Sequence, residues 1–265
     1  MSDYVIDVVE LKGFEVRYVV FGNGAKSMVV FPGMSVGYVD QLAEGFYAKY
    51  RKFAQDYKVY LFDRPSNLNE YSSVETMAED SVAALKILGL NDFYLIGYSQ
   101  GGMMCQYIAI NHPEMVKKLV LGSTLSKPNE TYTQVMRAWE CLSAAGDVVA
   151  LNNDCFCRIY SETYYSRYKR ALSMFAKVGT KKQLERFKYL SMAGLTVNCF
   201  DRLKEIICPV LAIGAEQDRV TTLQGIFEIV NQLGCDYFVY PEYGHSAYDE
   251  AKDYQERIEK FFKMG

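Results

Sequence analysis

The chain has 265 residues and a formal net charge of −3, and half of its residues are hydrophobic. Its length fits one large domain or a core with an insertion, and the mixing of basic and acidic residues along it argues against a nucleic-acid partner. No apolar run approaches the roughly 20 residues of a membrane span, and residues 1–3 lack the positive region of a signal peptide. The seven cysteines include no CxxC pair, so we expect free thiols and a cytoplasmic location.

Short apolar runs and helical patterns alternate along the chain. The segments expected to form strands are residues 5–9, 14–21, 28–31, 59–62, 93–96, 118–121, 210–213 and 237–240. Helical spacing is found in residues 39–57, 73–88, 101–110, 222–233 and 248–262. Between residue 124 and about residue 206 the pattern indicates one helix after another, without strands.

This alternation predicts an α/β fold, with a mostly parallel eight-stranded sheet and helices on both faces. The first two strands are too close in sequence for a crossover, so they are expected to be antiparallel. Residues 1–123 and 207–265 would form this core. Residues 124–206 are inserted after the sixth strand, and such an insertion must lie at the carboxyl edge of the sheet, where ligands bind. We therefore expect a helical cap, or lid, over the site.

A five-residue motif in the middle of the core indicates nucleophilic chemistry. Residues 97–101 read Gly-Tyr-Ser-Gln-Gly and match Gly-x-Ser-x-Gly, in which a serine occupies a sharp turn between a strand and a helix. The turn forces the serine backbone toward positive φ, and the two glycines would allow the strand and the helix to approach closely. Ser99 is therefore the candidate nucleophile.

A serine hydroxyl needs a base, and the base needs a carboxylate that fixes its tautomer. Of the two histidines in the chain, His245 follows the last predicted strand and is the candidate base. His112, before a proline at the end of a helix, is typical of a capping or surface residue. Asp218 fits the chain order Ser–Asp–His as the acid, and Glu216 is the alternative. Asp63 precedes the serine and is interpreted as a loop anchor bonded to local backbone.

The tetrahedral intermediate of acyl transfer needs two backbone N–H donors. The N–H of Gln100, at the start of the helix after the serine, is one candidate. The loop of residues 31–34 (Phe-Pro-Gly-Met) should supply the other, and we choose the N–H of Met34 because Gly33 permits a close approach of the backbone. A single glycine beside a bulky residue leaves less room for branched substituents in the substrate.

With these motifs the chain resembles the α/β-hydrolase superfamily in its capped form. The resemblance covers the core and rests on residues 31–34, 97–101, 214–218 and 244–245. It implies Ser99 as the nucleophile, Asp218 as the acid and His245 as the base. It also implies that Met34 and Gln100 are the oxyanion donors. Many relatives carry histidine where Pro32 stands, and proline has no N–H to repeat that residue's loop bonds. The serine at the nucleophile position argues against the dehalogenase and epoxide-hydrolase branches, which use a carboxylate there.

The expected cap is rich in aromatic residues, most of which should pack its helices on each other and on the core. Some of them would form an apolar roof over an acyl pocket, with tyrosine hydroxyls as polar contacts. The candidates for this lining are Trp139, Tyr160 and Tyr164.

The working hypothesis is a serine hydrolase that cleaves a small or medium carboxylic ester through an acyl-enzyme intermediate. Its substrate would be a small acyl compound, and no metal, cofactor, nucleic acid or membrane partner is expected. Amidase or aminopeptidase, thioesterase, lactonase and carbon–carbon hydrolase chemistry at the same site stay open. An alternative from a different class is a ligand-binding protein with little or no turnover. The oligomeric state is left open.

Overall fold

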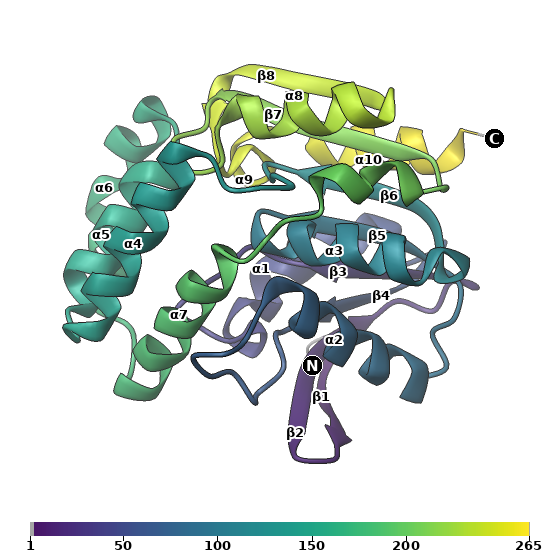
Figure 1. Ribbon diagram of the computed structural model, residues 1–265, viewed down its shortest axis with the longest axis horizontal. Helices are drawn as coiled ribbons and strands as arrows, with labels where there is room; N and C mark the ends of the chain where they lie inside the picture. Colours follow the sequence, from purple (N-terminus) through teal and green to yellow (C-terminus); the bar gives the residue numbers. More distant parts are fainter. Residues whose placement is uncertain (1–2, 265) are drawn as a thin grey trace.

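One twisted sheet organises the chain, which the computed structural model describes from residue 3 to residue 264 (Figure 1). Met1, Ser2 and Gly265, assigned above to the core, lie outside the described residues. Within that range the sheet order is β1-β2-β4-β3-β5-β6-β7-β8. Strand β2 is antiparallel to β1 and to β4, and the other neighbours are parallel, which confirms the predicted sheet with its antiparallel edge. The strands are β1 (Tyr4–Leu11), β2 (Phe14–Phe21), β3 (Lys26–Phe31), β4 (Tyr57–Phe62), β5 (Phe93–Tyr98), β6 (Val116–Gly122), β7 (Val210–Gln217) and β8 (Asp236–Gly244).

Helices cover both faces of the sheet because neighbouring residues of a strand point to opposite sides. In β3, Val29 and Phe31 pack into the core formed with α2, α3 and α8, whereas Met28 and Val30 pack into the core formed with α1 and α10. The helices of the core are α1 (Val39–Tyr50), α2 (Val74–Ile87), α3 (Gln100–Asn111), α8 (Thr222–Leu233), α9 (Ala247–Glu250) and α10 (Tyr254–Lys263). Helix α3 is buried almost throughout, so its place in the layer is fixed by packing on all sides.

The first helix of the core is shorter than predicted. The helix expected over residues 39–57 ends at Tyr50, a 3-10 turn follows, and β4 already begins at Tyr57. Phe53 in the 3-10 turn is still buried. The apolar spacing therefore continues past the end of the helix, and the spacing alone could not show where the helical hydrogen bonds stop.

The last predicted helix is interrupted. Instead of one helix over residues 248–262, the chain forms the short helix α9 and then α10. The backbone at Ala251 is extended, with φ −85° and ψ 124°, which ends α9. Ala251 and Tyr254 are both buried, so the apolar pattern runs through the break and hides it from sequence reasoning.

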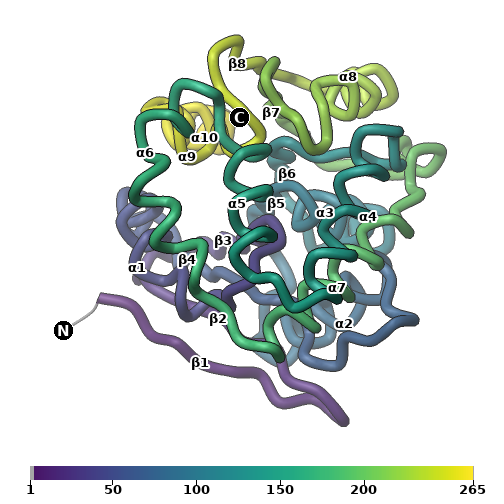
Figure 2. The backbone as a smooth tube through the Cα atoms, turned by 90° about the vertical axis from the view of Figure 1, so that its left-hand side faces the viewer, coloured from purple at the N-terminus to yellow at the C-terminus, as the bar shows by residue number. Residues whose placement is uncertain are grey.

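Residues 124–206, called the helical insertion below, connect β6 to β7. Within them the structure shows four α-helices and no strand: α4 (Glu130–Ala144), α5 (Val148–Ile159), α6 (Glu162–Phe175) and α7 (Lys181–Gly194). Each begins with a polar side chain that accepts a hydrogen bond from a backbone N–H of the first turn, as expected for a helix N-cap; these residues are Asn129, Asp147, Ser161 and Thr180. Figure 2 shows the four helices facing the viewer, in front of the sheet.

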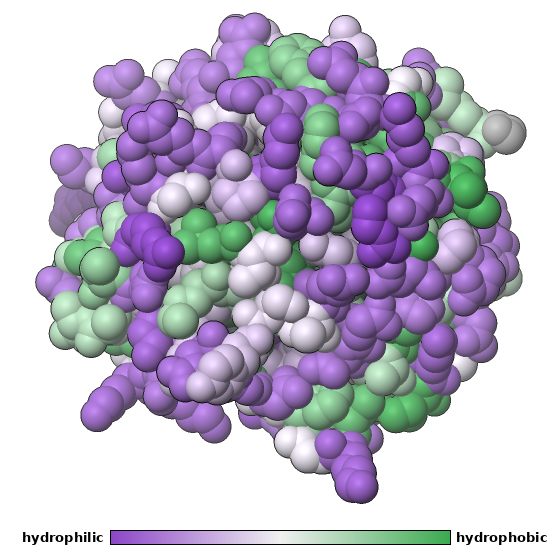
Figure 3. All heavy atoms as spheres, in the orientation of Figure 1, coloured by the Kyte–Doolittle hydropathy of each residue, from purple (hydrophilic) through white to green (hydrophobic). Residues whose placement is uncertain are grey.

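The face of the molecule drawn in Figure 3 is mostly hydrophilic, with apolar side chains in small separate patches. Among residues 3–264, no helix combines the length and the apolar character that crossing a membrane requires.

A group of buried tyrosines makes stability depend on alkaline pH. Burial raises the pKa of the phenols of Tyr50, Tyr98 and Tyr254 well above the ordinary value of 10. Since the folded state binds these protons more tightly than the unfolded state, their stabilisation is complete below about pH 10 and is lost as the pH rises further. Between about pH 10 and 12 we expect the tyrosinate absorbance at 295 nm to rise together with loss of the circular dichroism signal. Full ionisation of all tyrosines with unchanged circular dichroism would contradict this coupling.

Candidate functional site

The turn that carries Ser99 has the strained geometry expected from its sequence. Ser99 lies between β5 and α3 with φ 51° and ψ −123°. A Cβ on Gly97 would come within 2.6 Å of Cys105 Sγ, and a Cβ on Gly101 within 2.2 Å of the carbonyl oxygen of Phe31. Both glycines are therefore required by close packing. The same packing holds the backbone of Ser99 in its strained conformation.

His245 and Asp218 form a buried pair at the carboxyl edge of the sheet. Asp218 directly follows β7 and His245 directly follows β8, just as Ser99 directly follows β5. The distance between His245 Nδ1 and Asp218 Oδ2 is 2.9 Å, and both side chains are almost fully buried. Glu216, the alternative acid, is exposed. The structure thus brings Asp218, and not Glu216, to the histidine.

The Asp218 carboxylate is held in place by several donors at once. Its Oδ1 accepts hydrogen bonds from the N–H groups of Val220 (2.8 Å) and Thr221 (3.0 Å), and its Oδ2 accepts one from Thr221 Oγ1 (2.6 Å). Burial alone would raise the pKa of this carboxyl, but His245 and these donors hold the pKa below its ordinary value. Asp218 is therefore a fixed, charged acceptor for the imidazole.

Thr221 is a candidate site residue that sequence reasoning missed. Besides bonding Asp218, its hydroxyl lies 3.3 Å from His245 Nδ1. The sequence did offer a signal, because the hydroxyl of Thr221 comes three residues after the carboxylate of Asp218, just before α8. This spacing favours a local turn.

His112 lies away from this group. It follows the C-terminal end of α3, whose N-terminal end begins next to Ser99, so the length of a helix separates the two. Its Nε2 is 2.9 Å from a carboxylate oxygen of Glu79 on α2. This position agrees with the interpretation of His112 as a structural residue.

The loop after β3 lies beside Ser99, as the choice of oxyanion donors requires. A Cβ on Gly33 would be 3.4 Å from Ser99 Cβ. Gln100 is the first residue of α3, and its side chain donates a hydrogen bond to the carbonyl of Leu190 in α7 (2.7 Å). Pro32 has no N–H, but its carbonyl accepts a hydrogen bond of 2.6 Å from Arg64 Nη2, so a buried guanidinium supports the loop.

A pocket of about 730 Å³ opens next to this loop, between the core and the helical insertion. Most of its lining is apolar or aromatic and comes from the loop after β3, α1, α5, the end of α6 and α7. The lining includes Gly33, Met34, Leu42, Phe46, Phe156, Ile159, Tyr160 and Tyr248. The helical insertion therefore covers the edge of the sheet that carries Ser99, and the Ser99 side chain is itself buried.

Of the three aromatic residues predicted to line the pocket, only Tyr160 does so. Trp139 is buried between helices instead, with its ring 5.9 Å from that of Phe187 and its Nε1 donating to Asp154 (2.8 Å). Tyr164 stacks on Tyr160 with ring centroids 4.5 Å apart, and it is not part of the lining. Trp139 belongs to α4 and Tyr164 to α6, whereas the neighbouring part of the lining comes from one face of α5, which includes Phe156 and Ile159.

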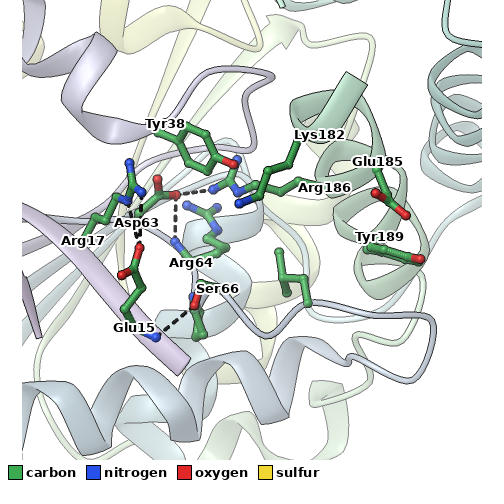
Figure 4. Close-up of a pocket in the computed structure, with 12 residues that line it drawn as sticks. Glu15, Arg17, Tyr38, Asp63, Arg64, Ser66, Lys182, Glu185, Arg186 and Tyr189 are labelled. Atoms are coloured by element: carbon green, nitrogen blue, oxygen red, sulfur yellow. Dashed lines mark hydrogen bonds and ion pairs between the residues drawn. The ribbon is translucent and has the colours of Figure 1, made fainter. Parts of the chain in front are cut away.

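A second, polar pocket of about 300 Å³ lies between β2, the segment after β4 and α7 (Figure 4). Asp63 accepts a hydrogen bond from the N–H of Val39 (3.1 Å) and forms an ion pair with Arg186 of α7. Arg186 also donates to the carbonyl of Ser35 (3.2 Å) and stacks over the ring of Tyr38. Asp63 is thus a loop anchor as expected, but it also joins the core to the helical insertion.

Burial lowers the pKa of Arg64, which lies at this polar pocket. The guanidinium of Arg64 is fully buried beside Asp63, and burial lowers its pKa to about 10, against the raising effect of the carboxylate. At neutral pH it stays charged and can hold the carbonyl of Pro32.

One of the seven cysteines lies at the apolar pocket. The seven cysteines are free. Cys155 lies in the pocket lining, and burial raises the pKa of its thiol well above the ordinary value, so it is not poised as a thiolate nucleophile. Residues 3–264 contain no group of three or more side chains placed to hold a metal ion.

Comparison with known proteins agrees with this architecture. Residues 31–146 match the family model described as "alpha/beta hydrolase fold". The solved structure of an alpha/beta hydrolase enzyme from a Medee basin deep-sea metagenome library superposes with a TM-score of 0.87, covering 98% of each chain, at 19% identity. At this identity the likeness establishes the fold alone.

Two curated relatives are similar in sequence. Epoxide hydrolase 1 of Caenorhabditis elegans is 25% identical over 261 residues, covering 85% of this chain and 61% of that protein. RutD of Stutzerimonas stutzeri, assigned as a carbamate hydrolase, is 33% identical over 81 residues, covering 28% of this chain and 31% of that protein. The chain thus spans less than two thirds of the length of either relative. With the sheet topology, the elbow and the family model together, the chain has the α/β-hydrolase fold.

Proposed function

We propose that the protein is a serine hydrolase that cleaves a carboxylic ester through an acyl-enzyme. The observation that carries this proposal is the buried pair of His245 and Asp218 at the same sheet edge as the strained Ser99. A pure binding protein has no use for an aligned base and acid, so the non-catalytic alternative receives less support.

In the first half of the reaction, Ser99 Oγ attacks the ester carbonyl and His245 Nε2 takes the hydroxyl proton. Asp218 fixes the imidazole tautomer by accepting from Nδ1–H and stabilises the imidazolium. The backbone N–H groups of Gln100 and Met34 would stabilise the oxyanion. The bond from the carbonyl carbon to the alcohol oxygen then breaks, and His245 gives the proton to the departing alcohol.

In the second half, water replaces the alcohol. His245 removes a proton from the water, whose oxygen attacks the acyl carbon, and the bond between Ser99 Oγ and that carbon breaks. The proton on His245 returns to Ser99, and the carboxylic acid leaves. No redox partner enters this balance, because only acyl and proton transfers occur.

The pocket favours an apolar substrate of small or medium size. Met34, Leu42, Phe46 and Phe156 contribute apolar surface, and the volume of about 730 Å³ lies within the usual range for small-molecule sites. We propose that the helical insertion acts as a cap over this pocket. Seven free thiols also favour work in a reducing compartment such as the cytoplasm.

The names of the relatives suggest two neighbouring chemistries. Carbamate hydrolysis is also attack on a carbonyl carbon, so the same serine, base and acid could perform it. Epoxide opening in the branch of the superfamily named above uses a carboxylate nucleophile, and Ser99 offers a hydroxyl in that position. We therefore favour carbonyl substrates over epoxides.

Labelling with a fluorophosphonate, followed by peptide mapping, tests the nucleophile directly. We expect one modified residue, Ser99, and turnover of p-nitrophenyl esters with a clear optimum in acyl chain length. Folded protein that neither reacts with the probe nor turns over any ester of the series would refute the proposal and favour a binding protein.

The chain-length optimum should follow the pocket size. Leu42 lies on α1 and lines the pocket, so Leu42→Trp should move the optimum toward shorter acyl chains. Ile87→Trp, at an exposed position on α2 outside the lining, is the matched control and should leave the optimum unchanged.

A further inference from the structure

A short segment of the helical insertion is bonded to both loops that carry the base and the acid. This junction segment, residues 157–161, comprises the last residues of α5 and the two residues between α5 and α6. On one side it meets the loop of residues 244–246 around His245, and on the other side it meets Arg219, the residue after Asp218. The two loops belong to different strands, β7 and β8, and the junction segment touches both.

The contact with the histidine loop is close and specific. The N–H of Ser246 donates to the carbonyl of Ile159 (2.7 Å). A Cβ on Gly244 would lie 2.7 Å from the backbone nitrogen of Ser161, so only glycine fits at this point. His245 is therefore flanked on both sides by residues that rest on the helical insertion.

Glu250 is the centre of this contact. Its Oε1 accepts hydrogen bonds from the N–H of Ser161 (3.0 Å) and from the N–H of Gly244 (3.0 Å). Its Oε2 accepts from the hydroxyl of Ser161. One carboxylate thus joins three donors, of which two belong to the junction segment and one to the residue before His245.

The loop of the acid is held from the same segment. Arg219 Nη2 donates to the carbonyl of Tyr160 (3.0 Å) and to the carbonyl of Cys157. The carbonyls of Cys157 and Tyr160 therefore bond the loop of the acid, whereas the carbonyl of Ile159 bonds the loop of the base. The N–H and the hydroxyl of Ser161 bond Glu250.

We propose that Glu250 is a positioning residue that couples the helical insertion to His245. This inference rests on the proposed function, in which His245 is the base. A carboxylate that accepts two backbone N–H groups fixes the separation of the segments that carry them. Losing it lets the histidine loop drift, and displacements near 1 Å in an active site lower rates by roughly 100-fold.

Three substitutions at Glu250, with one control substitution elsewhere, distinguish a positioning role from a general effect on stability. Glu250→Ala removes all three acceptor contacts, and Glu250→Asp keeps the charge but shortens the side chain, so it cannot reach both N–H groups. We expect both to lower kcat by roughly 10- to 100-fold with a small change in KM. Glu250→Gln keeps a carbonyl oxygen for the two N–H groups and should retain most of kcat. Glu242→Ala, at an exposed position on β8, is the matched loss of charge and should act like the parent protein.

The second measurement does not depend on the substrate. The downfield proton resonance of His245 Nδ1–H reports its hydrogen bond to Asp218. We expect it to broaden or shift in Glu250→Ala and Glu250→Asp, and to persist in Glu250→Gln and Glu242→Ala. Unchanged kcat and an unchanged resonance in folded Glu250→Asp would overturn the positioning role. Failure of Ser99 to react with a fluorophosphonate in the parent protein would refute the proposed function alone, and the resonance would still test Glu250.

Discussion

Replacing Ser99 by alanine is expected to lower kcat for ester hydrolysis by roughly 10⁴- to 10⁶-fold, because the proposed acyl-enzyme forms on the Ser99 hydroxyl. The change should leave the fold intact, since alanine adopts the same backbone conformation with a similar strain. Steady-state assays on the best p-nitrophenyl ester, with active-site titration of the parent protein, measure the effect.

Ser123 provides a matched control for this substitution. It follows the neighbouring strand β6, is buried, and also has a positive φ, 44°. Ser123→Ala should keep kcat within about 2-fold, whereas equal losses in the two variants would mean that the effect comes from backbone strain. Retained hydrolysis in Ser99→Ala would remove Ser99 from the mechanism.

Replacing Gly101 by alanine should cause a large loss of stability. The new Cβ would lie 2.2 Å from the carbonyl oxygen of Phe31 and 2.5 Å from that of Pro32, and both are backbone atoms that cannot turn aside. Overpacking of this kind costs about 3 kcal/mol. The shift would also displace the loop of Gly33, so we expect activity to fall together with the free energy of unfolding. Urea denaturation followed by fluorescence measures that free energy.

Gly45 is the control for this prediction because it is also a helical glycine. A Cβ there meets nothing within 4 Å. Gly45→Ala should raise the free energy of unfolding by about 0.5–1 kcal/mol, the usual difference between the two residues inside a helix. A neutral Gly101→Ala would show that β3 and α3 can separate more easily than the described packing allows.

The sheet and the triad candidates could be predicted because their signals are local. Apolar runs predict the strands. The two glycines of residues 97–101 predict the turn between strand and helix, and in the structure both are closely packed. Chain order alone then places Asp218 and His245 at the ends of two neighbouring parallel strands. The helix ends were less predictable, since buried residues such as Phe53 and Ala251 continue the apolar pattern where the helices stop.

The supporting contacts of the site could not be predicted, because they join residues far apart in the sequence. Arg64 supports Pro32, Arg186 reaches Asp63, and Glu250 bonds Ser161, each across a gap that no local pattern spans. The prediction of the pocket lining was wrong for Trp139 and Tyr164 for a related reason. Aromatic residues are frequent in the helical insertion, and only the observed phase of each helix shows which of them face the cavity.

The hydrophobic interior is continuous across the boundary between the core and the helical insertion. Tyr132 and Trp139 of α4 and Phe187 of α7 belong to the same continuous cluster as Val29 of β3 and Met103 of α3. The two parts therefore form one cooperative unit, which should melt in a single transition. Exchanging the insertion with that of a relative would leave interior surface without a partner, so a different insertion is compatible with this core only after this shared interior is repacked.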